Sequence, residues 1–365
     1  MRAILDARTV NDHYPGIGRY TFELARALAP LTDLVLLINP LQASQELDLR
    51  SLNAERIAVL RTPRSLQQQW VVPAHVRRAR GDIYHSPYYL MPYAPGLTAV
   101  VTAYDLIPLI IPDGFSAFQR AAYRATHQLA FRAARKIITL CESARQSFIE
   151  RFHLPTQKIV AIPPGLGPEF VLRPAEAVAA FREQRKLPRD YVLTVGSNKP
   201  HKNLPGLIRA YAALPAAAPP LVIAGPEDPR YSTDMRAAAA PLGERVIFLG
   251  RVAEAQLPLL YAGAALFVQP SLTEGFGLPV VEAMACRTPV ACSEAPGLVE
   301  AAGSAAILFD PRQPEAITHA LSTALTDSAL RTDLRTRGLR RAQTLTWSRT
   351  AEATLQVYTQ AVASG

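Results

Sequence analysis

Short runs of apolar residues alternate along the chain with longer segments in which apolar residues recur at helical spacing. In the first half, the apolar runs predict strands at 2–6, 33–38, 57–60, 82–85, 98–103, 136–140 and 158–161. Helical spacing predicts helices between them, near 18–30, 65–80, 116–135 and 142–152. Strands that are apolar at nearly every position are typical of a parallel sheet with helices on both faces. The first half is therefore expected to be an α/β domain.

The second half repeats this alternation after a stretch rich in proline and glycine at 162–168, which we interpret as a linker. Strands are predicted at 191–195, 221–224, 246–249, 265–269, 289–293 and 305–309. Helices are expected at 203–214, 231–241, 254–262, 278–286, 297–302 and 313–326, with two more near 328–344 and 347–363. We therefore predict an α/β protein of two Rossmann-like domains, 1–168 and 169–346, whose parallel sheets face each other across a cleft.

Composition narrows the class of protein. A chain of 365 residues suits roughly two domains. Its three cysteines have no paired spacing, which excludes a disulfide scaffold and a cysteine zinc site and fits a reducing cytoplasm. No apolar run reaches the roughly 18 residues that a membrane span needs, so we expect a cytoplasmic protein.

The net charge is +9, and most of the excess lies in the first half. Residues 1–168 hold 19 Lys and Arg against 12 Asp and Glu, whereas the remainder holds 20 against 18. Such a surface fits anionic lipid, a phosphate-bearing substrate or nucleic acid, or it is a solvated arginine-rich face. Nucleic acid is not expected as a partner, because the basic excess comes with no recognised nucleic-acid-binding motif.

The predicted helix at 116–135 is both basic and amphipathic. This pattern indicates peripheral contact with an anionic membrane, although a core helix with a solvated basic face explains it as well. The basic residues of this pattern are Arg120, Arg124, Arg132 and Arg135, followed directly by Lys136.

Glycines and charged residues follow four of the predicted strands, where ligands bind in open α/β sheets. The first such segment has Gly16 and Gly18 before a helix, where glycine lets the backbone approach an anion. A plain turn explains it equally well. In the second, Lys199 and Lys202 precede a helix for which Asn203 is the expected N-cap, so an anion site is predicted.

The third segment, after the strand at 265–269, is the most informative. Glu274 lies in a glycine-bracketed loop and Glu282 lies one turn into the following helix, with seven residues between them. The backbone N–H groups at the helix start would point outward between the two carboxylates. A phosphate held in the middle and hydroxyls held at both ends are what a nucleotide sugar requires. A helix-capping Glu274 with a surface Glu282 would explain neither the glycines nor the pairing.

The fourth segment, after the strand at 98–103, contains Tyr104 and Asp105. Asp105 could orient an acceptor hydroxyl or cap a turn, and spacing alone does not separate the two. His85 and Ser86 end another strand and are expected to face the same cleft.

These segments together resemble the retaining glycosyltransferases of family 4. The resemblance is carried by the Glu274–Glu282 spacing, by the early glycine segment and by three further stretches: NKPHKNL at 198–204, FLGRV at 248–252 and LPLLYAGA at 257–264. It extends from Asp6 to the Trp347–Ser348 region and implies the GT-B fold, in which a terminal helix at 347–365 crosses back to the first domain. IYHSPYYLMP at 83–92 and TAYDLIPLIIP at 102–112 are similar to mannosyltransferases of bacterial polysaccharide assembly.

The resemblance implies transfer of a hexosyl group, mannosyl being favoured, from a nucleoside-diphosphate sugar such as GDP-mannose to a glycan or lipid-linked acceptor. Lys202 would contact the diphosphate, Glu274 the transferred sugar and Glu282 the ribose. The implied donor-binding residues also include Gly16, Gly18, Ser197, Asn198, Arg251, Val252, Gly275, Phe276, Gly277 and Leu278. The implied catalytic residues are Glu274, Lys202 and Asp105, and the acceptor side comprises Tyr104, Asp105, His85 and Ser86.

Three positions depart from the family pattern, one of which, Cys141 in place of a common serine, is given no chemical role. Many members have arginine where Ser197 or Asn198 stands, and Lys199 and His201 are candidates to compensate. Many members have histidine where this chain has Tyr104.

No Asp-x-Asp motif accompanies the glycine segments, so we expect no metal and no other cofactor. Lys202, nearby cations and helix N-termini would then stabilise the leaving diphosphate. No enzymic nucleophile is evident, which favours front-face attack assisted by the donor phosphate. Two alternatives stay open: a nucleotide-sugar epimerase or hydrolase on the same fold, and a nucleotide-sugar-binding protein without turnover.

Overall fold

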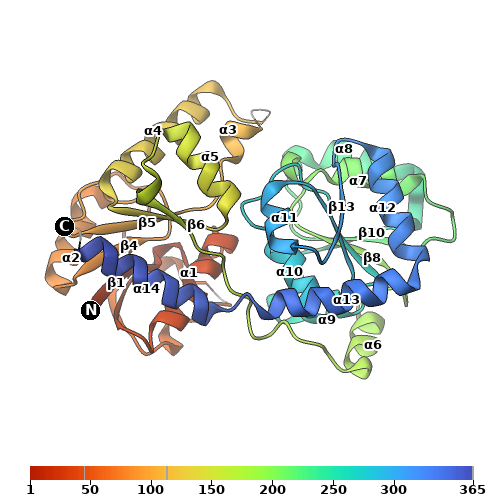
Figure 1. Cartoon of the computed structure of the whole chain (residues 1–365), viewed down its shortest axis with the longest axis horizontal. Helices are drawn as coiled ribbons and strands as arrows, with labels where there is room; N and C mark the ends of the chain where they lie inside the picture. Colours follow the sequence, from red (N-terminus) through yellow and green to blue (C-terminus); the bar gives the residue numbers. More distant parts are fainter. Residues whose placement is uncertain (45, 112–113, 364–365) are drawn as a thin grey trace. The chain divides into compact units, whose positions relative to one another are not determined.

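The computed structural model describes residues 1–44, 46–111 and 114–363 and separates into two compact units (Figure 1). The first unit comprises residues 1–165 together with the segment from 345 onward, and the second comprises 166–344. The chain leaves the first unit at Gly165, inside the predicted linker, and re-enters it at Leu345.

The first unit is built on a parallel seven-stranded sheet in the order β3-β2-β1-β4-β5-β6-β7. Its strands are β1 (Arg2–Asp6), β2 (Asp33–Ile38), β3 (Glu55–Ala58), β4 (Ile83–Ser86), β5 (Ala99–Ala103), β6 (Lys136–Thr139) and β7 (Ile159–Ala161). Its helices are α1 (Pro15–Leu28), α2 (Gln68–Ala79), α3 (Ile107–Ile110), α4 (Ala117–Ala133), α5 (Glu142–Phe152) and α14 (Trp347–Ala363). Short 3-10 helices occur at η1 (Ala7–Thr9), η2 (Pro40–Gln42), η3 (Leu49–Ser51) and η4 (Thr156–Lys158).

The second unit has a parallel six-stranded sheet in the order β10-β9-β8-β11-β12-β13. Its strands are β8 (Val192–Val195), β9 (Leu221–Ala224), β10 (Val246–Gly250), β11 (Leu266–Gln269), β12 (Val290–Ser293) and β13 (Ile307–Phe309). Its helices are α6 (Ala175–Gln184), α7 (Leu204–Ala212), α8 (Ser232–Ala239), α9 (Leu257–Ala262), α10 (Leu278–Ala285), α11 (Pro296–Ala302), α12 (Pro314–Thr326) and α13 (Ser328–Gln343). Its 3-10 helices are η5 (Pro200–Lys202), η6 (Pro229–Tyr231), η7 (Ala240–Arg245) and η8 (Glu254–Gln256).

The predicted strands are all present, with ends shifted by a residue or two. Two helices were not predicted, α3 and α6. Helix α6 buries only Val178 and Phe181 and directly follows the proline-rich stretch, so it has little apolar periodicity to reveal it. No helix of the described residues is long and apolar enough to cross a membrane.

Both sheets contain a point where the strand order reverses, and this point positions the sites described below. In the first unit the reversal lies between β1 and β4, and in the second between β8 and β11. In the second sheet, Leu193 pairs with Phe267, and Gln269 pairs with Cys292, so β8, β11 and β12 end at the same edge. Ligands of doubly wound sheets bind at this kind of edge, next to the reversal.

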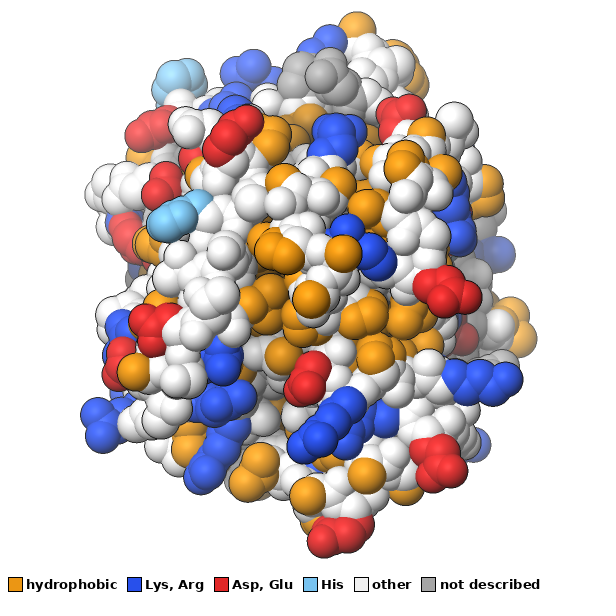
Figure 2. All heavy atoms as spheres, turned by 90° about the vertical axis from the view of Figure 1, so that its right-hand side faces the viewer, with side chains coloured by type: hydrophobic (Ala, Val, Ile, Leu, Met, Phe, Trp, Pro, Cys, Tyr) orange, Lys and Arg blue, Asp and Glu red, His pale blue; other side chains and the backbone are white. Residues whose placement is uncertain are grey.

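Charged side chains of both signs are interspersed over the face shown in Figure 2, which belongs to the side where the second unit lies in Figure 1. This mixture agrees with the nearly balanced charge of residues 169–365. The basic excess of the chain is therefore a property of the first half.

Candidate active site

Two loops that follow neighbouring strands meet at the edge of the second sheet. The loop after β8 contains η5 and ends in Lys202, and the loop after β11 contains Glu274. The Lys202 Nζ atom donates a hydrogen bond to Glu274 Oε1 at 2.5 Å. The backbone N–H of Leu272 also donates to the carbonyl oxygen of His201 at 2.7 Å. The structure therefore brings the predicted Lys202 and Glu274 together beside the strand reversal.

The Glu274 carboxylate is held by several donors at once. Its Oε1 atom also accepts hydrogen bonds from Ser271 Oγ at 2.8 Å and from Gln269 Nε2 at 3.1 Å. Burial would raise the pKa of Glu274, but the charge and hydrogen bond of Lys202, together with the Ser271 hydroxyl, lower it below its ordinary value. The carboxylate is therefore charged at neutral pH.

Two glycines shape the loop around Glu274. Gly277 has a φ of +99° and is the N-cap of α10, and a Cβ at this position would lie 2.3 Å from Leu298 Cδ2. Gly297, at the start of α11, lies against the loop so closely that a Cβ would be 2.5 Å from the Glu274 carbonyl oxygen. The loop therefore packs tightly on α11. In the first turn of α10, Pro279 has no N–H and the N–H of Val280 donates to the Gly277 carbonyl at 3.1 Å, so Leu278 supplies the N–H that helix bonding leaves over.

Glu282 lies on α10 in a different environment. It is 3% exposed, and its Oε2 atom accepts a hydrogen bond from the Tyr261 hydroxyl of α9 at 2.8 Å. The prediction placed one carboxylate on each side of the helix start, and both are partly enclosed by the fold. The alternative explanation, in which Glu282 lies on the surface, is therefore wrong.

The remaining residues of the β8 loop act mainly within the fold. Asn198 is 5% exposed; its Nδ2 atom donates to the Asp228 carbonyl at 2.9 Å and its Oδ1 atom accepts from the Asp228 N–H at 2.6 Å. It thereby ties this loop to the segment after β9, whereas Ser197 is half-buried. Asn203 is the N-cap of α7, as predicted, but its side chain makes no capping hydrogen bond: its backbone is left-handed, and the side chain donates to the carbonyl of Pro311. Burial, followed by the neighbouring Lys202 charge, lowers the pKa of His201 to about 4, so this histidine is not a cation at neutral pH.

A pocket of about 190 Å³ lies at the carboxyl ends of β8, β9 and β10. Gly196, Gly225 and Gly250 bring backbone to its wall, and the Arg236 guanidinium lies 3.9 Å from the centre of the Phe248 ring. The chain continues from Gly250 into an exposed Arg251 and a buried Val252. The pocket thus combines apolar side chains with backbone edges, a lining that suits a planar ring.

In the first unit, the two early glycines differ. A Cβ at Gly16 would meet no heavy atom within 4 Å, whereas a Cβ at Gly18 would lie 2.9 Å from the carbonyl oxygen of Thr9. Gly16 is exposed at the start of α1, and Gly18 is buried where α1 packs on η1. Packing alone therefore accounts for Gly18.

The predicted acceptor-side residues are largely enclosed. His85 is fully buried, with its ring nitrogens 2.7 Å from the Tyr358 hydroxyl and 2.8 Å from Thr102 Oγ1, and burial lowers its pKa to about 3. Ser86 is 2% exposed and donates to the carbonyl of Tyr88. The expectation that these two side chains face an acceptor does not fit their burial: His85 holds α14 on the sheet, and Ser86 closes a turn.

Tyr104 and Asp105 lie at the same edge. The Tyr104 ring packs edge-on against Tyr20 at 5.4 Å, and its buried hydroxyl has no hydrogen-bond partner among the described residues. Asp105 Oδ1 accepts from the N–H of Ile107 at 3.0 Å. This contact caps a turn, which is one of the two roles that the sequence allowed for Asp105.

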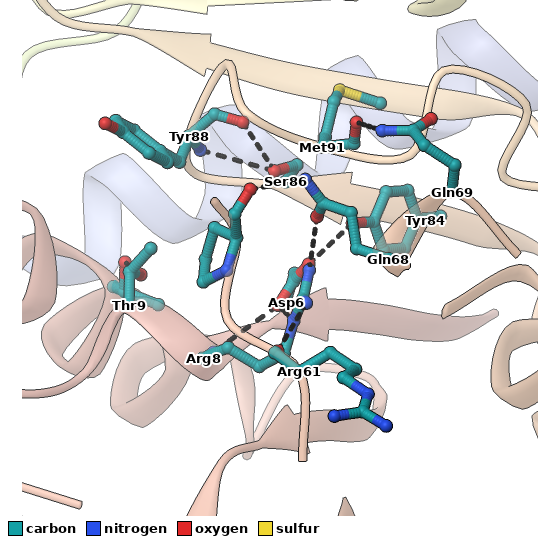
Figure 3. Close-up of polar contacts among 12 residues, drawn as sticks. Asp6, Arg8, Thr9, Arg61, Gln68, Gln69, Tyr84, Ser86, Tyr88 and Met91 are labelled. Carbon is teal, nitrogen blue, oxygen red and sulfur yellow. Dashed lines mark hydrogen bonds and ion pairs between the residues drawn. The ribbon is translucent and has the colours of Figure 1, made fainter. Parts of the chain in front are cut away.

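Sequence reasoning missed a buried charged network at the reversal between β1 and β4 (Figure 3). Arg8 is 1% exposed and donates to both oxygens of Asp6, to Gln68 Oε1 at 3.1 Å and to the carbonyl of Arg61 at 2.9 Å. The Tyr84 hydroxyl donates to Asp6 Oδ2 at 2.7 Å. The available signal was an acidic residue at the end of the first strand, Asp6, and a basic residue two positions later, Arg8.

Two Rossmann-like units with all-parallel sheets, with a lysine and a carboxylate at the strand reversal of the second, define the GT-B class. The family model for group 1 glycosyl transferases matches residues 178–341, and the model for glycosyltransferase family 4 matches 14–170. The chain therefore belongs to the family 4 glycosyltransferases, as the resemblance in the sequence implied. This membership makes it a glycosyltransferase and gives no support to the epimerase, hydrolase or binding-protein alternatives.

Three relatives illustrate the range of similarity. O-antigen chain mannosyltransferase B of Escherichia coli is 28% identical over 383 residues, covering 98% of this chain and 99% of that protein. The D-inositol 3-phosphate glycosyltransferase of Kineococcus radiotolerans is 31% identical, with 77% and 72% covered. The serotype-specific mannosyltransferase WbdA of Escherichia coli is 30% identical over 73% of this chain, which spans about a third of that longer protein.

Solved structures show the same fold. HepE of Anabaena, in complex with UDP-glucose, matches with a TM-score of 0.80 at 19% identity over 99% of this chain and 100% of that one. Sucrose-phosphate synthase of Thermosynechococcus elongatus matches with a TM-score of 0.79 at 22% identity over the full length of both chains.

Proposed function

We propose that this glycosyltransferase moves a mannosyl group from a nucleoside-diphosphate mannose to a glycan or lipid-linked acceptor, with retention of configuration and without a divalent metal. The observation that carries the proposal is the contact between Lys202 and Glu274 at the strand reversal, next to the start of α10. The mannosyl group is favoured because relatives such as O-antigen chain mannosyltransferase B are named for it.

The donor would lie along this edge. Its diphosphate would accept hydrogen bonds from Lys202 and from backbone N–H groups between Gly275 and Leu278, with the buried Phe276 anchoring the loop. The base would occupy the pocket beside Gly250, with Arg251 and Val252 next to it. Glu282 would accept hydrogen bonds from the ribose, and Glu274 from the transferred sugar.

Retention follows from attack on the face from which the diphosphate leaves. The acceptor hydroxyl oxygen bonds to the anomeric carbon as the bond from that carbon to the diphosphate oxygen breaks. The proton of the hydroxyl passes to the departing phosphate oxygen. Lys202 and the backbone N–H groups between Gly275 and Leu278 would stabilise the charge that develops on the diphosphate.

Donor binding and product stereochemistry test this function. Thermal unfolding is followed with GDP-mannose, UDP-glucose and UDP-N-acetylglucosamine, because a ligand that binds only the folded state raises the melting temperature. We expect the mannose donor to give the largest rise and the product to keep the donor's anomeric configuration by NMR. A larger rise with another sugar, or an inverted product, would contradict the proposal.

Metal independence is tested separately. Turnover should be unchanged by EDTA, because cations of the protein and helix N–H groups neutralise the diphosphate. Loss of turnover in EDTA, restored by Mg²⁺ or Mn²⁺, would refute this part.

The proposal also includes a cytoplasmic enzyme in peripheral contact with an anionic membrane. A pocket of about 590 Å³ in the first unit is lined by Arg120 and Arg124 of α4, by Glu150 and Arg151 at the end of α5, and by His153 just after it. Its three arginines outnumber the single carboxylate. Phe118, at the start of α4, is 81% exposed. Basic side chains beside an exposed aromatic ring suit an anionic lipid surface.

Vesicle co-sedimentation tests this contact. Binding should require anionic lipid and should fall in the double variant R120Q/R124Q. The double variant R77Q/R78Q, with two exposed arginines of α2 in the same unit, is the charge-matched control. Equal binding to neutral and anionic vesicles, or equal loss in both variants, would refute it.

A further inference from the structure

Three loops bring aromatic rings and one guanidinium to the carboxyl edge of the first sheet. Tyr14 lies between η1 and α1, Arg64 lies between β3 and α2, and Tyr88 and Tyr89 follow β4. The ring centres of Tyr14 and Tyr88 are 5.2 Å apart, and those of Tyr88 and Tyr89 are 4.5 Å apart. This group of four residues, here called the tyrosine–arginine cluster, lies beside the reversal between β1 and β4.

The interior of this reversal is already filled by the protein. Arg8 and Asp6 are buried and are engaged with each other, with Gln68 and with Tyr84 (Figure 3). A ligand at this edge therefore has to lie against the cluster, outside the buried pair. Tyr89 is in turn supported by His127, whose ring stacks on it at 3.9 Å.

Arg64 is the charged member of the cluster. Its guanidinium lies 5.7 Å from the centre of the Tyr14 ring, and its side chain is exposed. Among the residues that the structure describes, Arg64 forms no ion pair with a carboxylate, in contrast to Arg2 and Arg145 of the same unit. A guanidinium resting on a ring keeps its planar set of donors available to an oxyanion.

The tyrosine hydroxyls are close to this charge. Burial raises the pKa of Tyr14, with Tyr88 adding to the rise, while Arg64 acts in the opposite direction. Burial also raises the pKa of Tyr88, with the same opposing effect of Arg64. At neutral pH the hydroxyls are therefore protonated, so each can donate and accept hydrogen bonds next to a positive charge.

We propose that the tyrosine–arginine cluster is the acceptor subsite and that it selects an acceptor sugar linked through a phosphate. The proposal rests on the transfer reaction proposed above. Tyrosine rings offer flat apolar contact to a sugar, their hydroxyls can pair with sugar hydroxyls, and Arg64 can bind two phosphate oxygens side by side. A neutral glycan would leave the charge of Arg64, which contacts only the uncharged Tyr14 and Tyr88 side chains in the cluster, without an oxyanion to neutralise it.

A pair of arginine variants tests the selection. Octyl glycosides are offered as acceptors, each in a phosphate-linked and a directly linked form, with R64Q as the variant. The control is R61Q in the same loop, since Figure 3 shows the Arg61 side chain directed away from Tyr88. The wild type and R61Q should have a lower KM for the phosphate-linked form, and R64Q should lose this preference by about tenfold to a hundredfold. The KM for the donor should not change.

Equal use of both acceptor forms by the wild type would overturn the proposal, as would an equal loss in R61Q. The melting temperature of R64Q should match that of the wild type because Arg64 is exposed. If no sugar donor is consumed with any acceptor, the transfer reaction itself has failed. Calorimetric binding of the phosphate-linked octyl glycosides to wild type and R64Q then still tests the subsite.

Discussion

At the scale of single residues, the two carboxylates of the donor site are held in different ways. Glu274 shares one oxygen among a lysine, a hydroxyl and an amide, whereas Glu282 is held by the Tyr261 hydroxyl inside the fold. A donor molecule must therefore share Lys202 with Glu274. Substitutions at the two positions are therefore expected to have different effects on diphosphate affinity and on turnover.

The variant E282A should weaken binding of both the donor and the free nucleoside diphosphate, because both contain the ribose. Loss of a hydrogen bond to a charged group corresponds to about tenfold to more than a hundredfold in affinity. The variant E274A should leave diphosphate affinity nearly intact while turnover collapses, because the transferred sugar is absent from the diphosphate. Calorimetry with the diphosphate, beside turnover with the full donor, distinguishes them. Equal loss of diphosphate affinity in both would contradict this division.

Substitution of Lys202 is expected to have a third effect, which differs from those of E282A and E274A. The variant K202A should weaken every ligand that carries the diphosphate and should also slow turnover, because it removes a charge from the leaving group. It also removes the charged partner of Glu274, so the pKa of that carboxyl should rise, because burial raises it and Lys202 is the main opposing influence. Unchanged diphosphate affinity in K202A would contradict the assigned role.

Gly277 offers a test of the loop itself. The variant G277A should lose about 1–3 kcal/mol of stability, because alanine at positive φ is strained and its Cβ would collide with Leu298. Donor affinity should fall as well, since the start of α10 would shift. The control is G243A, at a glycine with φ of +51° and no heavy atom near its Cβ. Equal donor affinity in the two variants would refute the effect on the site.

The sequence was enough to predict which residues lie at the donor site when their place is set by the strand before them and the helix after them. Lys202 and Glu274 each follow a strand and precede a helix, and parallel strands bring such loops to one edge. The assignment of His85 to the acceptor side did not fit its burial, because its partner Tyr358 lies 273 residues away in the chain and local spacing does not show that contact. The position of Asn203 as the N-cap of α7 could be predicted, but its left-handed backbone and the hydrogen bond of its side chain to Pro311 could not.

At the scale of elements, α14 completes the first unit. His85 contacts the Tyr358 hydroxyl, Thr350 Oγ1 donates to the carbonyl of Pro163 at 2.8 Å, and Gly165 lies against the backbone of Trp347. The family resemblance implied that a terminal helix returns to the first domain, and these contacts hold α14 on the first unit. The spacing of residues within α14 does not reveal these contacts.

The variant Y358F tests the hydrogen bond between α14 and the sheet. It leaves a buried ring nitrogen of His85 without its partner, which costs about 1–3 kcal/mol. Thermal unfolding should show the loss in the first unit, and T359A, on the exposed face of the same helix, should be close to neutral. A Y358F protein as stable as T359A would show that the hydrogen bond contributes little.

At the scale of the whole molecule, the alternation of strands and helices was enough to predict two parallel α/β units. The order of strands in each sheet was not predictable from spacing, because nothing local marks where the order reverses. The buried network around Arg8 depends on that reversal, which is why the sequence did not reveal it. The same is true of the tyrosine–arginine cluster, whose members come from three separate loops.

The distribution of buried histidines makes a prediction about acid stability. Burial lowers the pKa of His85 and of His127 to about 3, and both belong to the first unit. In the second unit, burial and Lys202 lower the pKa of His201 to about 4. Each histidine is neutral in the fold but takes up a proton in the unfolded chain below about pH 6.5. Acidification from pH 6.5 toward 4 therefore favours unfolding.

The effect should be larger in the first unit because it contains two of these histidines. At pH 5 each costs about 2 kcal/mol of stability relative to pH 8. Calorimetric unfolding between pH 8 and 5 should show the transition of the first unit moving down further than that of the second. In H127F, which keeps a ring against Tyr89 but cannot titrate, the pH dependence of the first unit should shrink by about half. An unchanged pH dependence in H127F would show that this histidine does not control the acid response.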